Sequence, residues 1–126
     1  MNKQKQRQRE ALAVELAGQA YTVLSRHMSH GTTLGELVVL TEIAKGVYCD
    51  KPVTVSEIAK ITGLSRWVVS RIVLRYIEAG SIKEIKDPED SRKNRIIWTD
   101  LARNQSKSWS DDWLRLWEKS SLLFKS

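Results

Sequence analysis

The stretch "SRWVVSRIVLR", residues 65–75, contains three arginines and a tryptophan, side chains that recognise nucleic acids. On a helix of about 100° per residue, Trp67, Arg71 and Arg75 share the face opposite the apolar positions. A guanidinium donates paired hydrogen bonds to a phosphate or to guanine, and an aromatic ring contacts the methyl group of thymine. This face predicts a nucleic-acid-reading surface. The alternatives are a solvated charged face and, for Trp67, packing against the preceding helix.

A second set of charges lies in "DPEDSRKNR", residues 87–95, between the apolar runs "SIKEIK" and "RIIW". Asp-Pro begins turns, and Ser and Asn tolerate turn geometry, so the stretch predicts the tip of a β-hairpin between two short strands. Its cations would face a polyanion. The alternative is an ordinary surface turn with an exposed ion pair, which stabilises a fold little.

Two predicted helices position the first of these surfaces. Thr54 and Glu57 have capping-box spacing and begin a short helix, and Ser65 caps a longer one after the turn at residues 62–64. Two helices joined by a short glycine-bearing turn are the helix-turn-helix pattern, whose second helix enters the major groove. Its apolar stripe predicts the core positions Val69, Ile72, Val73, Tyr76 and Ile77.

The rest of the chain is also predicted to be mainly helical. Apolar spacing predicts a helix from about Arg7 to Met28, a second helix capped by Thr33 and stopped by Gly46, and a last helix from Thr99. The fold class is therefore mainly α with a small β-hairpin wing, a winged helix-turn-helix.

The first and last predicted helices have more apolar surface than the small core of a winged helix can cover. We therefore expect residues 1–31 and 100–126 to form a dimerisation region on either side of a DNA-binding domain at residues 32–99. The predicted dimer-interface residues are Leu12, Leu16, Trp109, Trp113, Leu116 and Trp117. An aromatic-lined ligand pocket is the alternative for the tryptophans.

Composition narrows the class of function. The 126 residues include 21 Lys and Arg against 15 Asp and Glu, a net charge of +6, which favours polyanionic partners. The single cysteine, Cys49, cannot form an intramolecular disulfide, and no apolar run has the length of a membrane span, so we expect a cytoplasmic protein with no targeting segment.

No arrangement of catalytic residues is recognisable, so an enzyme is not expected. His27, His30 and Cys49 lack a fourth ligand, so neither a metal nor a cofactor is predicted, and Cys49 is interpreted as an idle thiol.

From about Thr33 to Ala102 the sequence resembles the MarR family of bacterial transcription regulators. The wing carries the family's pattern of an aspartate, an arginine two residues later, an apolar residue and a closing threonine, and "TVSEIAKITGLS" is similar to the family's helix-turn-helix segment. The matching wing residues are Asp90, Arg92, Ile96 and Thr99. Glu84 and Ile85 stand where the family commonly has an arginine before the wing. The short C-terminal part is also similar to the SarA-like branch.

The resemblance implies specific roles for the wing. Arg92 would enter the minor groove, Asp90 would hold it, and Lys93 and Arg95 would contact phosphates. With the helix-turn-helix, the predicted DNA-contacting set is Thr54, Ser56, Ser65, Arg66, Trp67, Val68, Ser70, Arg71, Arg75, Arg92, Lys93 and Arg95.

The expected function is a homodimeric, sequence-specific regulator of transcription, a repressor that binds pseudo-palindromic double-stranded DNA. Two alternatives stay open: a winged helix used for protein or non-specific nucleic-acid contact, and mainly a sensor of a small aromatic effector.

Overall fold

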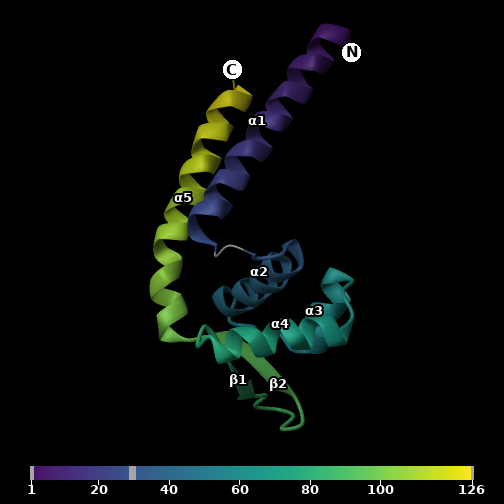
Figure 1. Ribbon diagram of the computed structural model, residues 1–126, viewed down its shortest axis with the longest axis vertical. Helices are drawn as coiled ribbons and strands as arrows, with labels where there is room; N and C mark the ends of the chain where they lie inside the picture. The colour runs from purple at the N-terminus through teal and green to yellow at the C-terminus, as the bar shows by residue number, and fades with distance from the viewer. Residues whose placement is uncertain (1, 29–30, 126) are drawn as a thin grey trace. The chain divides into compact units, whose positions relative to one another are not determined.

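The computed structural model describes residues 2–28 and 31–125, with side chains as far as Ser121. These described residues form five α-helices and one two-stranded antiparallel sheet (Figure 1). In chain order the elements are α1 (Lys3–His27), α2 (Leu34–Tyr48), α3 (Val55–Thr62), α4 (Arg66–Glu78), β1 (Ile82–Lys86), β2 (Asn94–Trp98) and α5 (Asp100–Lys125). They belong to two compact units, one within residues 31–105 and one within residues 1–30 and 106–126. None of the helices in the described ranges is long and apolar enough to cross a membrane.

The helix-turn-helix is confirmed at α3 and α4, and its ends are set by the predicted caps. The Thr54 hydroxyl accepts from the Glu57 N–H at 3.2 Å, and the Glu57 carboxylate accepts from the Thr54 N–H at 3.3 Å. Gly63 ends α3 at a φ of 78°, where other residues are strained. Ser65 then accepts from the Val68 N–H at 3.1 Å and starts α4.

The core of the unit at residues 31–105 lies between α2, α3, α4 and the sheet. The predicted stripe of α4 is confirmed, since Val69, Ile72 and Val73 are buried and Tyr76 and Ile77 pack against them. The other buried members of this core are Val39, Ile43, Val53, Ile58, Ala59, Ile82 and Ile96.

The predicted hairpin is also confirmed. In its register Ile82 pairs with Trp98, and Lys86 pairs with Asn94 at the end near the wing tip. Val53 adds a bridge on the other edge of β2, where its carbonyl accepts from the Ile96 N–H at 2.9 Å. The segment before α3 is thereby joined to the wing.

Two predicted helix boundaries were wrong. α1 begins at Lys3, before the predicted start near Arg7, because Asn2 caps it by accepting from the Lys5 N–H at 2.8 Å. Gly46 does not stop α2. It lies inside the helix, and its lack of a side chain makes room for the following segment, since a Cβ there would lie 2.9 Å from the carbonyl oxygen of Lys51.

The second unit contains α1 and the C-terminal part of α5. Val23 is buried there, and Nε2 of His27 lies 2.7 Å from Oδ2 of Asp112. Trp109 and Trp113 meet edge to face, with ring centroids 5.9 Å apart. The large apolar side chains of this unit that remain exposed include Val14, Tyr21, Leu114 and Trp117.

Candidate nucleic-acid interface

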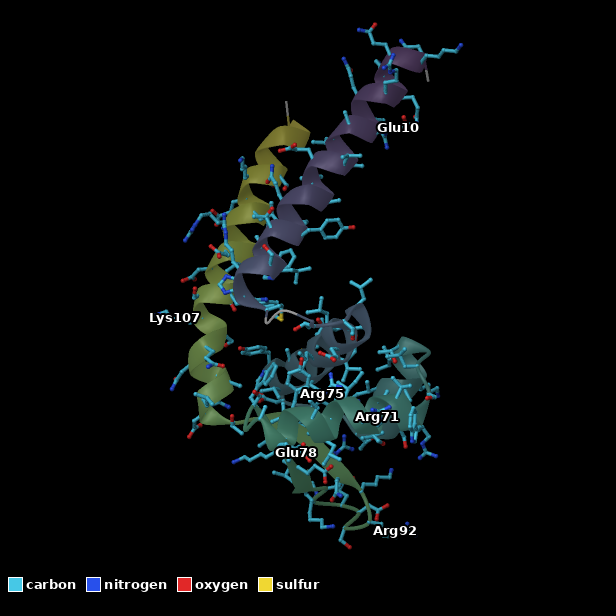
Figure 2. The ribbon with its side chains drawn as sticks, viewed as in Figure 1. Glu10, Arg71, Arg75, Glu78, Arg92 and Lys107 are labelled. Carbon is cyan, nitrogen blue, oxygen red and sulfur yellow. The ribbon has the colours of Figure 1, made fainter. Side chains whose placement is uncertain are left out.

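The exposed face of α4 carries the side chains predicted for it. The exposed side chains of this face are Trp67, Arg71, Leu74, Arg75 and Glu78. Figure 2 shows Arg71, Arg75 and Glu78 along the helix. Trp67 is 66% exposed and lies outside the apolar core, so the alternative of packing against α3 does not describe it. The guanidinium carbon of Arg71 lies 4.7 Å from the centroid of the Trp67 ring.

Arg75 differs from Arg71 because it is tied to the interior. Its guanidinium donates to Oε1 of Glu36 on α2, and the Tyr76 hydroxyl donates to Oε2 of the same carboxylate at 2.9 Å. Glu36 is only 4% exposed, so these donors compensate a buried charge. Burial raises the pKa of Tyr76, and the Glu36 carboxylate raises it further. This cluster joins the recognition helix to α2.

At the tip of the wing, Asp90 holds Arg92. Its Oδ1 accepts from the Arg92 backbone N–H and from Nε, both at 3.1 Å, while Oδ2 accepts from Nη2 at 3.3 Å. The Arg92 side chain lowers the pKa of Asp90, followed by the Arg92 backbone N–H. Arg92 itself is 89% exposed, so its guanidinium is oriented and accessible.

At the base of the wing, Arg95 connects several segments. Its Nε lies 2.7 Å from Oδ2 of Asp87, and its Nη1 donates to the Pro52 carbonyl and lies 3.2 Å from Oε1 of Glu57. The pKa of Asp87 is lowered, first by the backbone N–H of Glu89 and then by Arg95. The side chain of Arg95 is 22% exposed. It therefore braces the wing against α3, a geometry that differs from a freely exposed phosphate contact.

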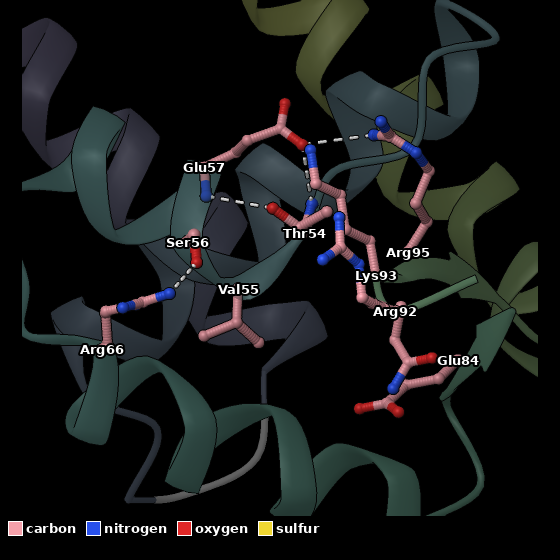
Figure 3. A pocket seen from close by; sticks show the side chains of 10 residues that line it. Thr54, Val55, Ser56, Glu57, Arg66, Glu84, Arg92, Lys93 and Arg95 are labelled. Carbon is pink, nitrogen blue, oxygen red and sulfur yellow. Dashed lines mark hydrogen bonds and ion pairs between the residues drawn. The ribbon is translucent and has the colours of Figure 1, made fainter. Parts of the chain in front are cut away.

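A groove of about 600 Å³ lies between the starts of α3 and α4 and the wing (Figure 3). Arg66 and Lys93 line it from opposite elements, and Ser56 accepts a hydrogen bond from Arg66. The complete lining is Thr54, Val55, Ser56, Glu57, Arg66, Glu84, Arg92, Lys93, Asn94 and Arg95. The first turns of both helices and the wing thus share one surface.

The other predicted contact residues have varied surroundings. The hydroxyls of Thr54 and Ser65 cap helices, while Ser70 is exposed on α4. Val68 is partly buried and packs against the core, so it faces away from the exposed surface.

Sequence reasoning missed the buried Glu36 and the carboxylate of Asp87, which position Arg75 and Arg95. The capping position of Glu36, three residues after Thr33, is visible in the sequence, but its partners 39 and 40 residues away are not.

The residues considered for a metal are separated by their contacts. His27 pairs with Asp112, Cys49 is exposed, and His30 lies outside the described residues. Across residues 2–28 and 31–125, no three His, Cys, Asp or Glu side chains are grouped as metal ligands.

Comparison with known proteins adds a family and a fold. The sequence model of the MarR family matches residues 30–93. Among solved structures, an S. aureus MepR mutant bound to an oligodeoxyribonucleotide is similar with a TM-score of 0.71 and 15% identity, over 97% of this chain and 83% of that chain. YusO from Bacillus subtilis has a TM-score of 0.67 and 18% identity, over 92% and 77%. PcaV from Streptomyces coelicolor, a transcriptional regulator in complex with its natural ligand, has a TM-score of 0.55 and 19% identity, over 90% and 84%. The curated proteins include no match.

Proposed function

The chain belongs to the MarR family, whose members are transcription regulators and not enzymes, and from this premise we propose that it is a homodimeric repressor of transcription that binds a pseudo-palindromic DNA site. Occupation of such a site would block access of RNA polymerase. One of the similar structures, the MepR mutant, is itself bound to an oligodeoxyribonucleotide, and this supports DNA as the partner.

The observation that carries the proposal is the shared groove. This groove is lined by Arg66 at the start of α4 and by Arg92 and Lys93 of the wing. The helix and the wing can therefore present their cations to one partner. A helix fits the major groove of B-form DNA, and an arginine fits the narrower minor groove beside it. We assign α4 to the former and Arg92 to the latter.

Within this interface the cations have different tasks. Arg66, Arg71 and Arg75 of α4 are all exposed, and Arg71 is the one without a hydrogen bond or ion pair in the described part of the chain, so we assign it to reading a base and the exposed Lys93 to phosphate. Arg75 and Arg95 have partners within the chain, so we propose that they keep α4 and the wing in position. Any phosphate contact they make is secondary to that role.

Dimerisation is proposed from the unit of α1 and α5. Trp117 is 73% exposed, and Val14, Tyr21 and Leu114 are also exposed large apolar side chains of these helices. Leu12, Leu16, Trp109, Trp113 and Leu116 are partly buried in the single chain. A second copy would cover the exposed apolar surface and place two recognition helices about 34 Å apart, one turn of DNA.

Binding-site selection from a random duplex pool tests the proposal. We expect a two-fold symmetric consensus with half-sites about one helical turn apart. The affinity for this duplex should fall steeply with salt, and Lys93→Ala should reduce the slope of log K against log salt by about 1 for each subunit of the dimer. Equal affinity for selected and random duplexes would instead support a module for non-specific nucleic-acid or protein contact.

A small-molecule effector is the second candidate function. Among the described residues, the indole N–H groups of Trp109 and Trp113 are buried without an acceptor, as is that of Trp98 in β2, and the rings of Trp109 and Trp113 contact each other. Buried donors are normally paired, so a ligand with an acceptor group, such as an aromatic carboxylate, would satisfy them. The ligand-bound PcaV structure supports this class of function. Tryptophan fluorescence during titration with aromatic acids tests it, and Trp109→Phe and Trp113→Phe should weaken any response.

A further inference from the structure

Trp67 and Arg71 form a cation–π pair on the exposed face of α4, one helical turn apart. The guanidinium carbon is 4.7 Å from the ring centroid, and the ring is 66% exposed. A single exposed aromatic ring is common on protein surfaces. This ring, however, lies on the N-terminal half of the recognition helix, the half that contacts base edges in helix-turn-helix proteins.

The cation–π contact leaves Arg71 free to donate. In the described part of the chain its guanidinium has no ion pair or hydrogen bond, whereas Arg75 on the next turn is held by Glu36. A cation–π contact engages the ring and no oxygen acceptor, so the N–H groups of the guanidinium remain available for the O6 and N7 atoms of guanine. The ring also restricts the arginine before DNA binds, which lowers the entropy lost on binding.

The apolar ring beside the guanidinium suits a particular neighbour of that guanine. In B-form DNA the C5-methyl group of a pyrimidine projects into the major groove next to the edge of the base that follows it. A methyl group placed there would be covered by the Trp67 ring while Arg71 binds the guanine.

We propose that Trp67 and Arg71 act together to read a C5-methylated pyrimidine followed by guanine on the same strand. Thymine supplies the methyl group in the ordinary step, and 5-methylcytosine supplies the same group in methylated DNA. The inference rests on the proposed function, because it requires α4 to lie in the major groove. Arginine recognises guanine through its O6 and N7 atoms, and the Trp67 ring would add a preference for a methyl group on the base that precedes this guanine.

The test uses the duplex selected from the random pool by the wild-type protein. Four versions carry thymine, uracil, cytosine or 5-methylcytosine before the contacted guanine, and affinities are compared at one salt concentration. Thymine against uracil, and 5-methylcytosine against cytosine, each differ by one methyl group. We expect each removal of the methyl group to weaken wild-type binding about fourfold, the effect of burying one such group.

Matched variants assign the effect to the pair. Trp67→Ala should abolish both methyl differences while it keeps the preference for guanine, and Trp67→Phe should retain part of them. Arg71→Ala should lower the preference for guanine about fivefold to a hundredfold. Both side chains lie outside the core, so each variant should remain folded. Thermal unfolding of each variant checks this.

Three results would overturn the inference while the proposed function stands: a selected site without a pyrimidine–guanine step, a methyl effect below about twofold, or the same methyl effect in Trp67→Ala. In each case the wild type would still prefer its selected duplex to a random one. If that preference is absent, the proposed function fails and the inference fails with it.

Discussion

Nε of Arg95 lies 2.7 Å from Oδ2 of Asp87, across the two ends of the wing loop. The same guanidinium reaches the Pro52 carbonyl and Glu57, so the pair joins the wing to the start of α3. The MarR family commonly has an arginine just before the wing, but this chain has Glu84 and Ile85 there, in β1. The brace is supplied by β2 instead, and DNA binding by the wing should depend on it.

Asp87→Asn should make the fold less stable at neutral pH and flatten its response to acid. The pKa of Asp87 is lowered below its usual 3.8 in the folded chain, by the Glu89 N–H first and then by Arg95. Its stabilising contribution is therefore complete above that usual value and is lost as the pH falls through the lower folded-state pKa. Thermal unfolding at several pH values should show the variant and the wild type converging in acid. Asp111→Asn, at an exposed position of α5, is the control and should show no such convergence.

Arg75→Ala and Arg71→Ala should have different effects, because Arg75 is proposed to hold α4 in position and Arg71 is proposed to read a base. Removal of Arg75 leaves the buried carboxylate of Glu36 with fewer donors, so the free energy of unfolding should fall by about 1–3 kcal/mol. Removal of Arg71 should change stability by no more than about 0.5 kcal/mol but weaken specific DNA binding. Urea denaturation and gel-shift titration measure the two effects. Equal stability of the two variants would show that the contact with Glu36 contributes little.

Gly46→Ala should destabilise the unit at residues 31–105 by about 1–3 kcal/mol, because the added methyl group forces the following segment to move. It would lie 2.9 Å from the Lys51 carbonyl oxygen and 3.2 Å from the Val53 nitrogen, both backbone atoms. Gly18→Ala in α1 is the matched control, since nothing lies within 4 Å of the new atom. It should stabilise the helix by about 0.5–1 kcal/mol. Urea denaturation of both variants checks the opposite signs.

Trp117→Glu should weaken the proposed dimer. The side chain is 73% exposed in the single chain, so the change leaves the monomer intact but adds a charge to the apolar surface that a partner would cover. Sedimentation equilibrium should show a larger fraction of monomer for this variant than for the wild type. Leu34→Glu, at an exposed position in the other unit, should leave the oligomeric state unchanged. A wild type that is monomeric at all concentrations would contradict the proposed dimer.

The sequence predicted those features that depend on neighbours along the chain. Thr54 and Glu57 are three residues apart, so the capping box was recognisable as a local pattern, whereas the pairing of Asp90 with Arg92 was implied by the resemblance to the MarR family. The helix-turn-helix and the hairpin followed from the same kind of signal, since caps, turns and apolar spacing act over one or two turns.

Features set by distant segments were missed or misread. Gly46 resembles a helix stop, but its lack of a side chain serves the close approach of Lys51 in a tertiary contact. Arg95 resembles Arg92 in the sequence, yet its partner Pro52 is 43 residues away. The sequence alone therefore gives no means of telling a bracing arginine from a reading one.

The most direct test of DNA recognition by α4 and the wing compares the affinity of four proteins for the selected duplex: the wild type, Arg71→Ala, Arg92→Ala and the control Arg7→Ala on α1. We predict that Arg71→Ala and Arg92→Ala each bind about fivefold or more weakly, because we assign one arginine to the major groove and the other to the minor groove. Arg7→Ala should bind like the wild type. If the Arg71 and Arg92 variants both retain wild-type affinity, α4 and the wing do not form the DNA-binding surface.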